Sequence, residues 1–185
     1  MDLERFRSAL AAHSPVDPDV AVERRAATAA VLRFTPTGPE VLLMVRAERQ
    51  GDLWSGHVAM PGGRHEPQDR DLLATAIRET REEIGVDLSD ATVLGRLAAV
   101  QAMGLPMTVT TYVFHLAEDQ TVVLSEEGTD WFWFPLARAA SGELDEEFDF
   151  TYQDRGYRLQ SWRWGAWRVW GLTHHMLTGL LTLVR

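Results

Sequence analysis

One stretch decides the fold of this chain: Gly62-Gly-Arg-His-Glu-Pro-Gln-Asp-Arg-Asp-Leu-Leu-Ala-Thr-Ala-Ile-Arg-Glu-Thr-Arg-Glu-Glu-Ile-Gly85. After the glycine pair and Pro67, the residues as far as Ile84 include neither glycine nor proline. This predicts a helix from about Asp71 to Ile84. Gly85 follows at once and suits the left-handed residue that ends many helices.

Three carboxylates share one face of the predicted helix. Glu79, Glu82 and Glu83 are related by i, i+3 and i+4, and Arg78 lies beside Glu82 at i+4. A different face carries the apolar side chains that would pack on a sheet, Leu73, Ile77 and Ile84. A divalent cation turns the repulsion of the carboxylates into binding, because Mg²⁺ and Mn²⁺ prefer carboxylate oxygens and water. A solvated acidic face is the alternative, and the surrounding residues decide between the two.

Those surrounding residues resemble the Nudix box, Gly-x5-Glu-x7-Arg-Glu-U-x-Glu-Glu-x-Gly-U, where U is apolar. The run from Arg78 to Val86 fits the second half, with Thr80 at an apolar position. Gly63 fits the opening glycine. Asp69 stands for the usual acid, and eight residues rather than seven separate it from the arginine. The match to the whole pattern identifies the chain as a member of the Nudix hydrolase family.

The extra residue resembles the coenzyme A pyrophosphatase branch of that family. Its Pro-Gly-Gly-x-x-acid-x-x-Asp pattern is matched by the run from Pro61 to Asp69. Upstream, Leu42 to Ala47 resembles its Leu-Leu-x-x-Arg-(Ser/Ala) stretch, and Val169 to Thr173 resembles its late Trp-Gly helix start. Coenzyme A or an acyl-coenzyme A is therefore the leading substrate.

Departures from this branch keep other substrates open. His57 stands where the branch has glutamine, and Met60 where it has phenylalanine. The stretch from Glu48 to Ser55 lacks the usual Arg-x-His. ADP-ribose-like compounds and other nucleoside diphosphate derivatives remain alternatives, as does a non-catalytic Nudix-fold sensor, although such sensors usually lose carboxylates of the box.

The resemblance implies an α/β fold, an α/β/α sandwich with a mixed sheet and a loop–helix–loop catalytic motif. It implies Mg²⁺ or Mn²⁺, and hydrolysis of a small-molecule nucleotide substrate in which a nucleoside diphosphate is linked to another group. By position, the three glutamates of the helix would bind the metal, one of them accepting a proton from water. Arg78 would support them, and the Gly63 carbonyl could also reach a metal. Family members are often dimers, so a homodimer is one candidate assembly.

Residues outside the helix extend the candidate site. Arg46 and Arg49 suit phosphate oxygens, although a surface role fits them as well. His57 and Gly62 lie where the resemblance places substrate, and a structural role is the alternative for the histidine. Glu127 lies in a loop where Nudix proteins often place a metal-binding or basic acid. Glu126 competes for that role.

The rest of the chain fits a single domain, 1–185, with a short N-terminal helix and linker at about 1–24. Strands are expected at Ala26 to Phe34, Val41 to Val45, His57 to Met60, Val93 to Val100, Met107 to Leu116 and Trp131 to Phe134, the last buried on both faces. Glu143 to Asp149 is expected to be a solvated loop, with a lid over the site as the alternative. Trp162 to Val184 is expected to be mostly helical, apart from its first few residues. Six of the seven tryptophans lie between Trp131 and Trp170, and they suit core packing or a dimer interface, with stacking on a nucleotide base as the sharper alternative.

Composition restricts the classes of function. The absence of cysteine excludes disulfides and thiolate chemistry, and a net charge of −9 disfavours binding to a nucleic-acid backbone. No apolar h-region opens the chain and no run of about 18 apolar residues occurs, so we expect no membrane span and a cytoplasmic protein.

Overall fold

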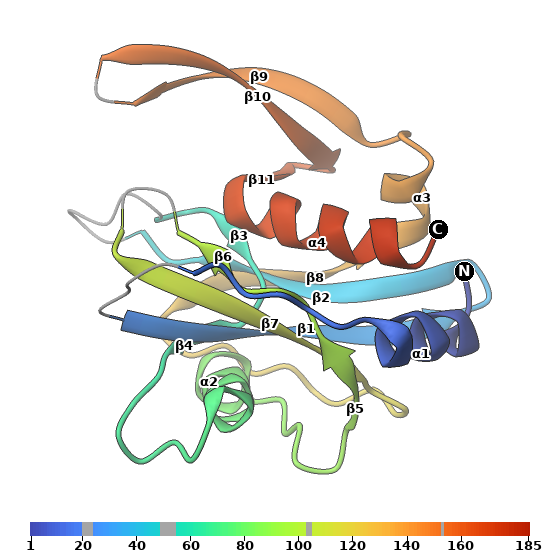
Figure 1. Cartoon of the computed structure of the whole chain (residues 1–185). Coiled ribbons are helices and arrows are strands. Elements are labelled where there is room, and N and C mark those ends of the chain that lie inside the picture. The colour runs from blue at the N-terminus through green and yellow to red at the C-terminus, as the bar shows by residue number, and fades with distance from the viewer. Residues whose placement is uncertain (20–23, 49–54, 103–104, 153) are drawn as a thin grey trace.

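The computed structural model describes residues 1–19, 24–48, 55–102, 105–152 and 154–185 (Figure 1). The elements are α1 (Leu3–Ala12), β1 (Arg24–Thr35), β2 (Gly38–Arg46), β3 (Val58–Ala59), β4 (Gly62–Arg64), α2 (Leu72–Ile84), β5 (Thr92–Arg96), β6 (Val100–Gln101), β7 (Met107–His115), β8 (Gly128–Pro135), α3 (Leu136–Ala140), β9 (Asp145–Tyr152), β10 (Arg155–Trp164), β11 (Trp167–Trp170) and α4 (Gly171–Leu183). Within the described ranges, no helix combines the length and the apolar character that a membrane crossing requires.

The larger sheet is mixed and has eight strands. β1 pairs with β7 in parallel and with β2 antiparallel, and β8 and β3 flank β2. Helix α2 covers one face of this sheet, and α4 covers the other (Figure 1). This layering confirms the predicted α/β/α sandwich.

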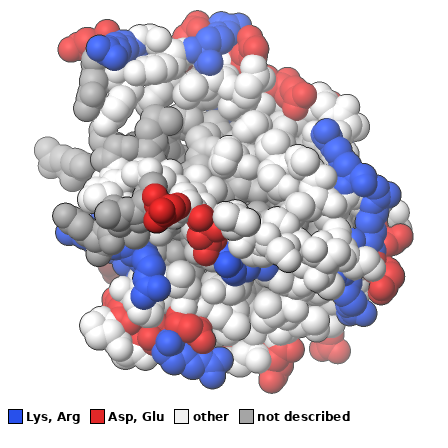
Figure 2. All heavy atoms as spheres, in the orientation of Figure 1, with Lys and Arg blue, Asp and Glu red and all other residues white. Residues whose placement is uncertain are grey.

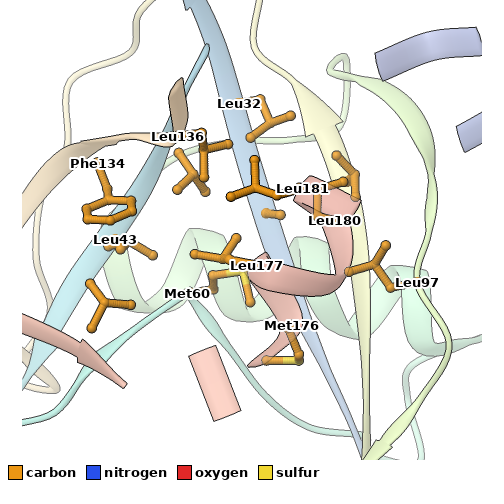
Figure 3. Close-up of a cluster of buried hydrophobic side chains, with 14 of the residues drawn as sticks. Leu32, Leu43, Met60, Leu97, Phe134, Leu136, Met176, Leu177, Leu180 and Leu181 are labelled. Carbon is orange, nitrogen blue, oxygen red and sulfur yellow. The ribbon is translucent and has the colours of Figure 1, made fainter. Parts of the chain in front are cut away.

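Strand β1 supplies both halves of the core, because successive side chains point to opposite faces. Ala30 and Leu32 belong to the cluster beneath α1 and α4 (Figure 3). Ala29 and Val31 belong to the cluster beneath α2. The long apolar run therefore reads as a strand covered on both sides, as in other sandwiches with helices on both faces of a sheet.

Helix α2 begins and ends where the sequence predicts, and its most deeply buried residues are mostly small. The Asp71 carboxylate accepts a hydrogen bond from the Ala74 N–H at 2.8 Å and caps the helix, and Gly85 ends it at φ 71°. The predicted packing face is confirmed, because Ile84 is buried in the cluster with β1, and Leu73 and Ile77 are partly buried and pack against that cluster. Fully buried positions of α2 include Thr75, Ala76, Thr80 and Ile84. Small side chains at three of these positions let the helix lie close to the sheet.

Three other expectations are corrected. The acidic stretch from Glu143 is not a loop, since Asp145–Tyr152 forms β9 in a second, three-stranded sheet with β10 and β11. The helix expected over most of 162–184 begins only at Gly171, because Trp167–Trp170 forms β11. Strand β8 is not buried on both faces, because Trp131 is 36% exposed.

Candidate active site

The three glutamates of α2 and the loop before β8 line an open hollow at the surface. Its volume is about 310 Å³, and it is lined by Glu79, Glu82, Glu83, Ser125, Glu126 and Glu127. The helix and the loop thus contribute five carboxylates to one small space. Both candidates from the loop, Glu126 and Glu127, reach it, whereas Ser125 was not singled out by the sequence.

Backbone hydrogen bonds fix the loop beside the helix. The N–H groups of Val123 and Ser125 donate to the carbonyls of Ile84 and Glu83 at 2.9 and 2.8 Å. The Glu127 carbonyl accepts from the Ala47 N–H, just beyond β2, at 2.8 Å. The loop therefore uses carbonyls that the end of α2 leaves without intrahelical partners, and its carboxylates are held against those of the helix.

Glu83 is the most deeply placed carboxylate of the group. Its side chain accepts a hydrogen bond from the Gly62 N–H at 2.8 Å, and the residue is only 5% exposed. Burial raises the pKa of this carboxyl to about 7, and the negative charges of Glu79 and Glu127 act in the same direction. The Gly62 N–H and the positive charge of Arg46 oppose the rise in pKa. A carboxyl held in this way exchanges its proton near neutral pH.

The two glycines before the helix lie against the site in different ways. A Cβ on Gly63 would lie 2.5 Å from the Glu79 carboxylate, so this carboxylate rests directly on the glycine. Gly62 has φ 152°, and a Cβ there would lie 2.3 Å from the backbone oxygen of Ala27 in β1. Gly63 therefore leaves room for a functional side chain, and Gly62 lets the turn approach the sheet.

Arg78 connects the turn to the carboxylates. Its Nε and Nη2 donate to the two oxygens of Asp69 at 2.9 and 3.0 Å, and Nη2 also donates to the Arg64 carbonyl at 3.0 Å. Its Nη1 lies 2.9 Å from both the Glu79 and Glu82 carboxylates. The guanidinium beside Asp69 holds the pKa of that acid well below its usual range. Asp69 thereby fixes the arginine that orients two site carboxylates.

Replacing Asp69 with asparagine should lower the free energy of unfolding at pH 7 by about 2 kcal/mol, because the partly buried Arg78 guanidinium loses the charged acceptor of two hydrogen bonds. Asp69 has a depressed pKa in the folded state, so its contribution is complete above the unfolded value and is lost as pH falls below about 4. Urea unfolding at pH 7 and pH 3 measures both effects. The Glu143→Gln variant, which breaks an exposed pair with Arg138, is the control and should unfold at the wild-type midpoint. An Asp69→Asn loss of equal size at both pH values would contradict the ion-pair account.

Arg46 and His57 lie at the end of the sheet beside this hollow. Arg46 ends β2, and its N–H donates to the His57 carbonyl at 3.0 Å. The His57 ring lies 4.5 Å from the Trp170 ring, so this histidine packs among aromatic side chains. Arg49 lies outside the described residues.

The site suits a hard divalent cation by the chemistry of its donors. Burial raises the pKa of Glu79 as well as that of Glu83. The negative charges of Glu82 and Glu127 raise the pKa of Glu79 further, and those of Glu79 and Glu127 raise the pKa of Glu83. A cation would offset this repulsion with oxygen ligands of the type that Mg²⁺ and Mn²⁺ prefer. In the described part of the chain, no three acidic or histidine side chains converge around a single point as they stand. Glu79 and Glu82 turn towards Arg78 instead, so binding would draw them away from it.

Comparison with known proteins decides the family. The sequence model of the NUDIX domain family matches residues 23–154 of this chain. The chain belongs to the Nudix family. This confirms the family predicted from the box, and it gives the loop–helix–loop of β4 and α2 its place in a known motif.

Two curated relatives and one solved structure resemble this Nudix chain. Over 143 residues it is 34% identical to the mitochondrial coenzyme A diphosphatase NUDT8 of Homo sapiens, an alignment that covers 73% of this chain and 58% of that protein. It is 30% identical over 133 residues to the uncharacterized Nudix hydrolase NudL of Photorhabdus laumondii, covering 71% of each. The structure of a C. elegans Ap4A hydrolase binary complex has a TM-score of 0.52 and 27% identity, covering 64% of this chain and 84% of that one. The chain thus spans less than two thirds of the human relative.

Proposed function

We propose that this Nudix chain hydrolyses a diphosphate bond in a nucleoside diphosphate derivative with the help of Mg²⁺ or Mn²⁺. The observation that carries the proposal is the hollow lined by buried Glu83, partly buried Glu79 and the carboxylates of the loop before β8. Acidic groups that are buried close together destabilise the folded protein, and such clusters occur mainly at functional sites.

Coenzyme A or an acyl-coenzyme A is the substrate we favour. The glycine-rich turn from Pro61 to Asp69 resembles the coenzyme A branch, and the human relative is named a coenzyme A diphosphatase. The similarity to an Ap4A hydrolase structure supports other nucleoside diphosphate derivatives, such as dinucleoside polyphosphates, as alternatives. ADP-ribose-like compounds also remain alternatives.

The site residues have distinct parts in the proposed reaction. A bound divalent cation would neutralise charge on the phosphate oxygens and lower the pKa of a water molecule. The glutamates of α2 and the Gly63 carbonyl would hold that cation, and Arg46 would attract the phosphates. Glu83, the most deeply buried carboxylate of the hollow, can accept the proton of the attacking water. The water oxygen forms the new bond to phosphorus, and the bridging oxygen leaves with the other phosphate. Glu127 is the alternative base, because it lines the same hollow.

A substrate panel tests the proposed activity and its specificity. Phosphate-bond cleavage is measured with coenzyme A, acetyl-coenzyme A, ADP-ribose, NADH, diadenosine polyphosphates and the deoxynucleoside triphosphates, first with Mg²⁺ and then with Mn²⁺. We expect the coenzyme A compounds to be cleaved with the highest kcat/KM. Preference for another compound would assign the departures at His57 and Met60 to specificity. Failure to cleave any of them, with the protein folded and the metal present, would favour the sensor.

Removal of the divalent metal should abolish the activity and lower the thermal stability. The carboxylates repel each other without a cation, so a metal that binds only the folded state stabilises it by about 2.7 kcal/mol at a concentration of 100 Kd. Activity and Tm are measured after dialysis against EDTA and again after Mg²⁺ or Mn²⁺ is restored. An unchanged Tm across the titration would show that the hollow binds neither ion.

The single domain over residues 1–185, the cytoplasmic location and the homodimer remain predictions. Light scattering of the purified protein measures the assembly.

A further inference from the structure

The hairpin of β9 and β10 has two chemically different faces. Residues opposite one another in an antiparallel pair point to the same side, and Phe148 lies opposite Leu159, as Phe150 lies opposite Tyr157. Trp170 of β11 lies on this side as well, since it contacts both phenylalanine rings. We refer to Phe148, Phe150, Tyr157, Leu159 and Trp170 as the aromatic face.

The other side of the hairpin is charged. Arg158 binds Glu147 at 3.1 Å and Asp149 at 3.0 Å, and all three side chains are exposed. Acidic and basic side chains lie together along the top of the molecule in Figure 2, where Figure 1 places this hairpin. Water therefore solvates the outer side, and the aromatic face points inwards.

The rings of the aromatic face remain accessible at its outer end. Ring centroids lie 5.3 Å apart for Phe148 and Trp170, and 4.8 Å apart for Phe150 and Trp170, in edge-on or tilted arrangements. Tyr157 is 43% exposed although it belongs to the aromatic side. The Arg168 guanidinium lies over the Phe148 ring at 4.3 Å, so the rings that leave faces and edges for another planar group are those of Phe150 and Tyr157.

This face lies at the same end of the large sheet as the carboxylates. The Trp170 and His57 ring centroids lie 4.5 Å apart. The His57 carbonyl accepts a hydrogen bond from the Arg46 N–H, and the positive charge of the Arg46 side chain acts on Glu83. The free end of the hairpin lies over the end of the sheet that carries β3 (Figure 1). From His57 to Gly63 an extended chain would reach at most roughly 20 Å, and the turn at Gly62 shortens this. The span is comparable to an extended nucleoside diphosphate.

We infer that the aromatic face binds the base of the nucleotide whose diphosphate lies at the carboxylates. Stacking on aromatic side chains is the common way to bind a base, and it requires no particular hydrogen-bond pattern. The inference rests on the proposed function, because that function places the diphosphate in the neighbouring hollow. It assigns to β9, β10 and β11 the part of the substrate that the carboxylates do not contact.

Binding of ADP and of inorganic pyrophosphate, measured by calorimetry with Ca²⁺ present, separates the base from the phosphates. The Phe150→Ala variant should weaken ADP binding by about 5- to 100-fold and leave pyrophosphate binding within about two-fold. Tyr157→Ala, at an exposed position opposite Phe150, should weaken ADP binding in the same sense without loss of the fold. Thr151→Ala, next to Phe150 but on the polar side, is the matched control and should bind both compounds like the wild type.

Three results would overturn the inference. Unchanged ADP affinity in both variants would show that the face does not contact the base. Equal loss for ADP and pyrophosphate would show that the hairpin only supports the fold. A wild-type dimer that becomes a monomer in both variants, with unchanged ADP affinity per chain, would assign the face to a second copy. Base binding and hydrolysis fail separately: ADP binding that depends on Phe150 in a protein that cleaves nothing in the panel would remove the hydrolase and keep the base site.

Discussion

Replacing Glu83 with glutamine should lower kcat by about 10³-fold while the protein stays folded. Glutamine has the same shape and retains an oxygen that can accept the Gly62 N–H, so the 2.8 Å hydrogen bond to the turn survives. It cannot accept a proton from water, and its amide is a poor ligand for Mg²⁺ beside carboxylates. Turnover of the best substrate in the panel, measured at saturating Mg²⁺, gives the effect.

The same variant should be more stable than the wild type in the absence of metal at high pH. The folded pKa of Glu83 is raised to about 7, so ionisation of this buried acid costs stability as pH rises from about 4.5 through 7. Glutamine avoids that cost, and its Tm in EDTA should exceed the wild-type Tm at pH 8 but not at pH 4. A gain in stability with a loss of activity is typical of a functional group rather than a structural one.

Glu118→Gln is the control for both measurements, because this glutamate is exposed and lies outside the hollow. It should change neither kcat nor Tm. If Glu83→Gln retained turnover within ten-fold, Glu83 would be neither the base nor a required ligand, and Glu127 would become the leading candidate. If the wild type bound nucleotides without metal and cleaved none, a sensor would explain the site better.

Helix α2 was predictable because its signals are local. Three signals mark this helix: the Asp71 cap, the Gly85 end and the spacing of the glutamates. Each signal depends only on residues within about one turn of its own position. Its packing was less predictable, since a hydrophobic pattern selects Leu73 and Ile77, whereas close contact with β1 selects the smaller Ala76 and Thr80. Distance to the neighbouring strand, a tertiary property, decides which residues are buried.

The second sheet was missed for a similar reason. The run Asp145-Glu-Glu-Phe-Asp-Phe-Thr-Tyr152 alternates polar and aromatic residues, which is a strand pattern, but its acidic composition suggested a solvated loop. Glu147 and Asp149 lie on the outer side, where Arg158 from β10 neutralises both. The sequence contained the alternation, and the partner strand that makes it a sheet lies some ten residues away.

The network around Arg78 shows a further limit of sequence reasoning. The spacing predicts its contact with Glu82, and the structure adds bonds to Asp69 and the Arg64 carbonyl. Thr75 also donates to Asp69 at 2.8 Å, which no periodic pattern announces. Such contacts cross the turn before the helix, so they depend on how the loop closes.

Replacing Gly63 with alanine should lower kcat/KM by about 10²-fold with little loss of stability. The added Cβ would lie 2.5 Å from the Glu79 carboxylate, which is the far end of a flexible side chain and can move aside. Movement of about 1 Å is enough to spoil a ligand or base position, and misplacement of that size costs on the order of 10² in rate. The activity loss should be accompanied by a weaker apparent affinity for Mg²⁺, measured by titrating the metal at a fixed substrate concentration.

The neighbouring glycine gives the opposite result, and the pair tests the geometry of the turn. Gly62→Ala places a Cβ 2.3 Å from the Ala27 backbone oxygen and requires an alanine at φ 152°, so we expect a loss of about 3 kcal/mol or more in the free energy of unfolding. Gly179→Ala, in α4 with nothing within 4 Å of the added atom, should keep full activity and gain about 0.5 kcal/mol. If Gly63→Ala unfolds the protein as readily as Gly62→Ala, the Glu79 carboxylate does not rest against Gly63 in the folded protein. If Gly63→Ala keeps wild-type activity and metal affinity, the exact position of Glu79 is not required for the reaction, and the metal is held by Glu82, Glu83 and the loop.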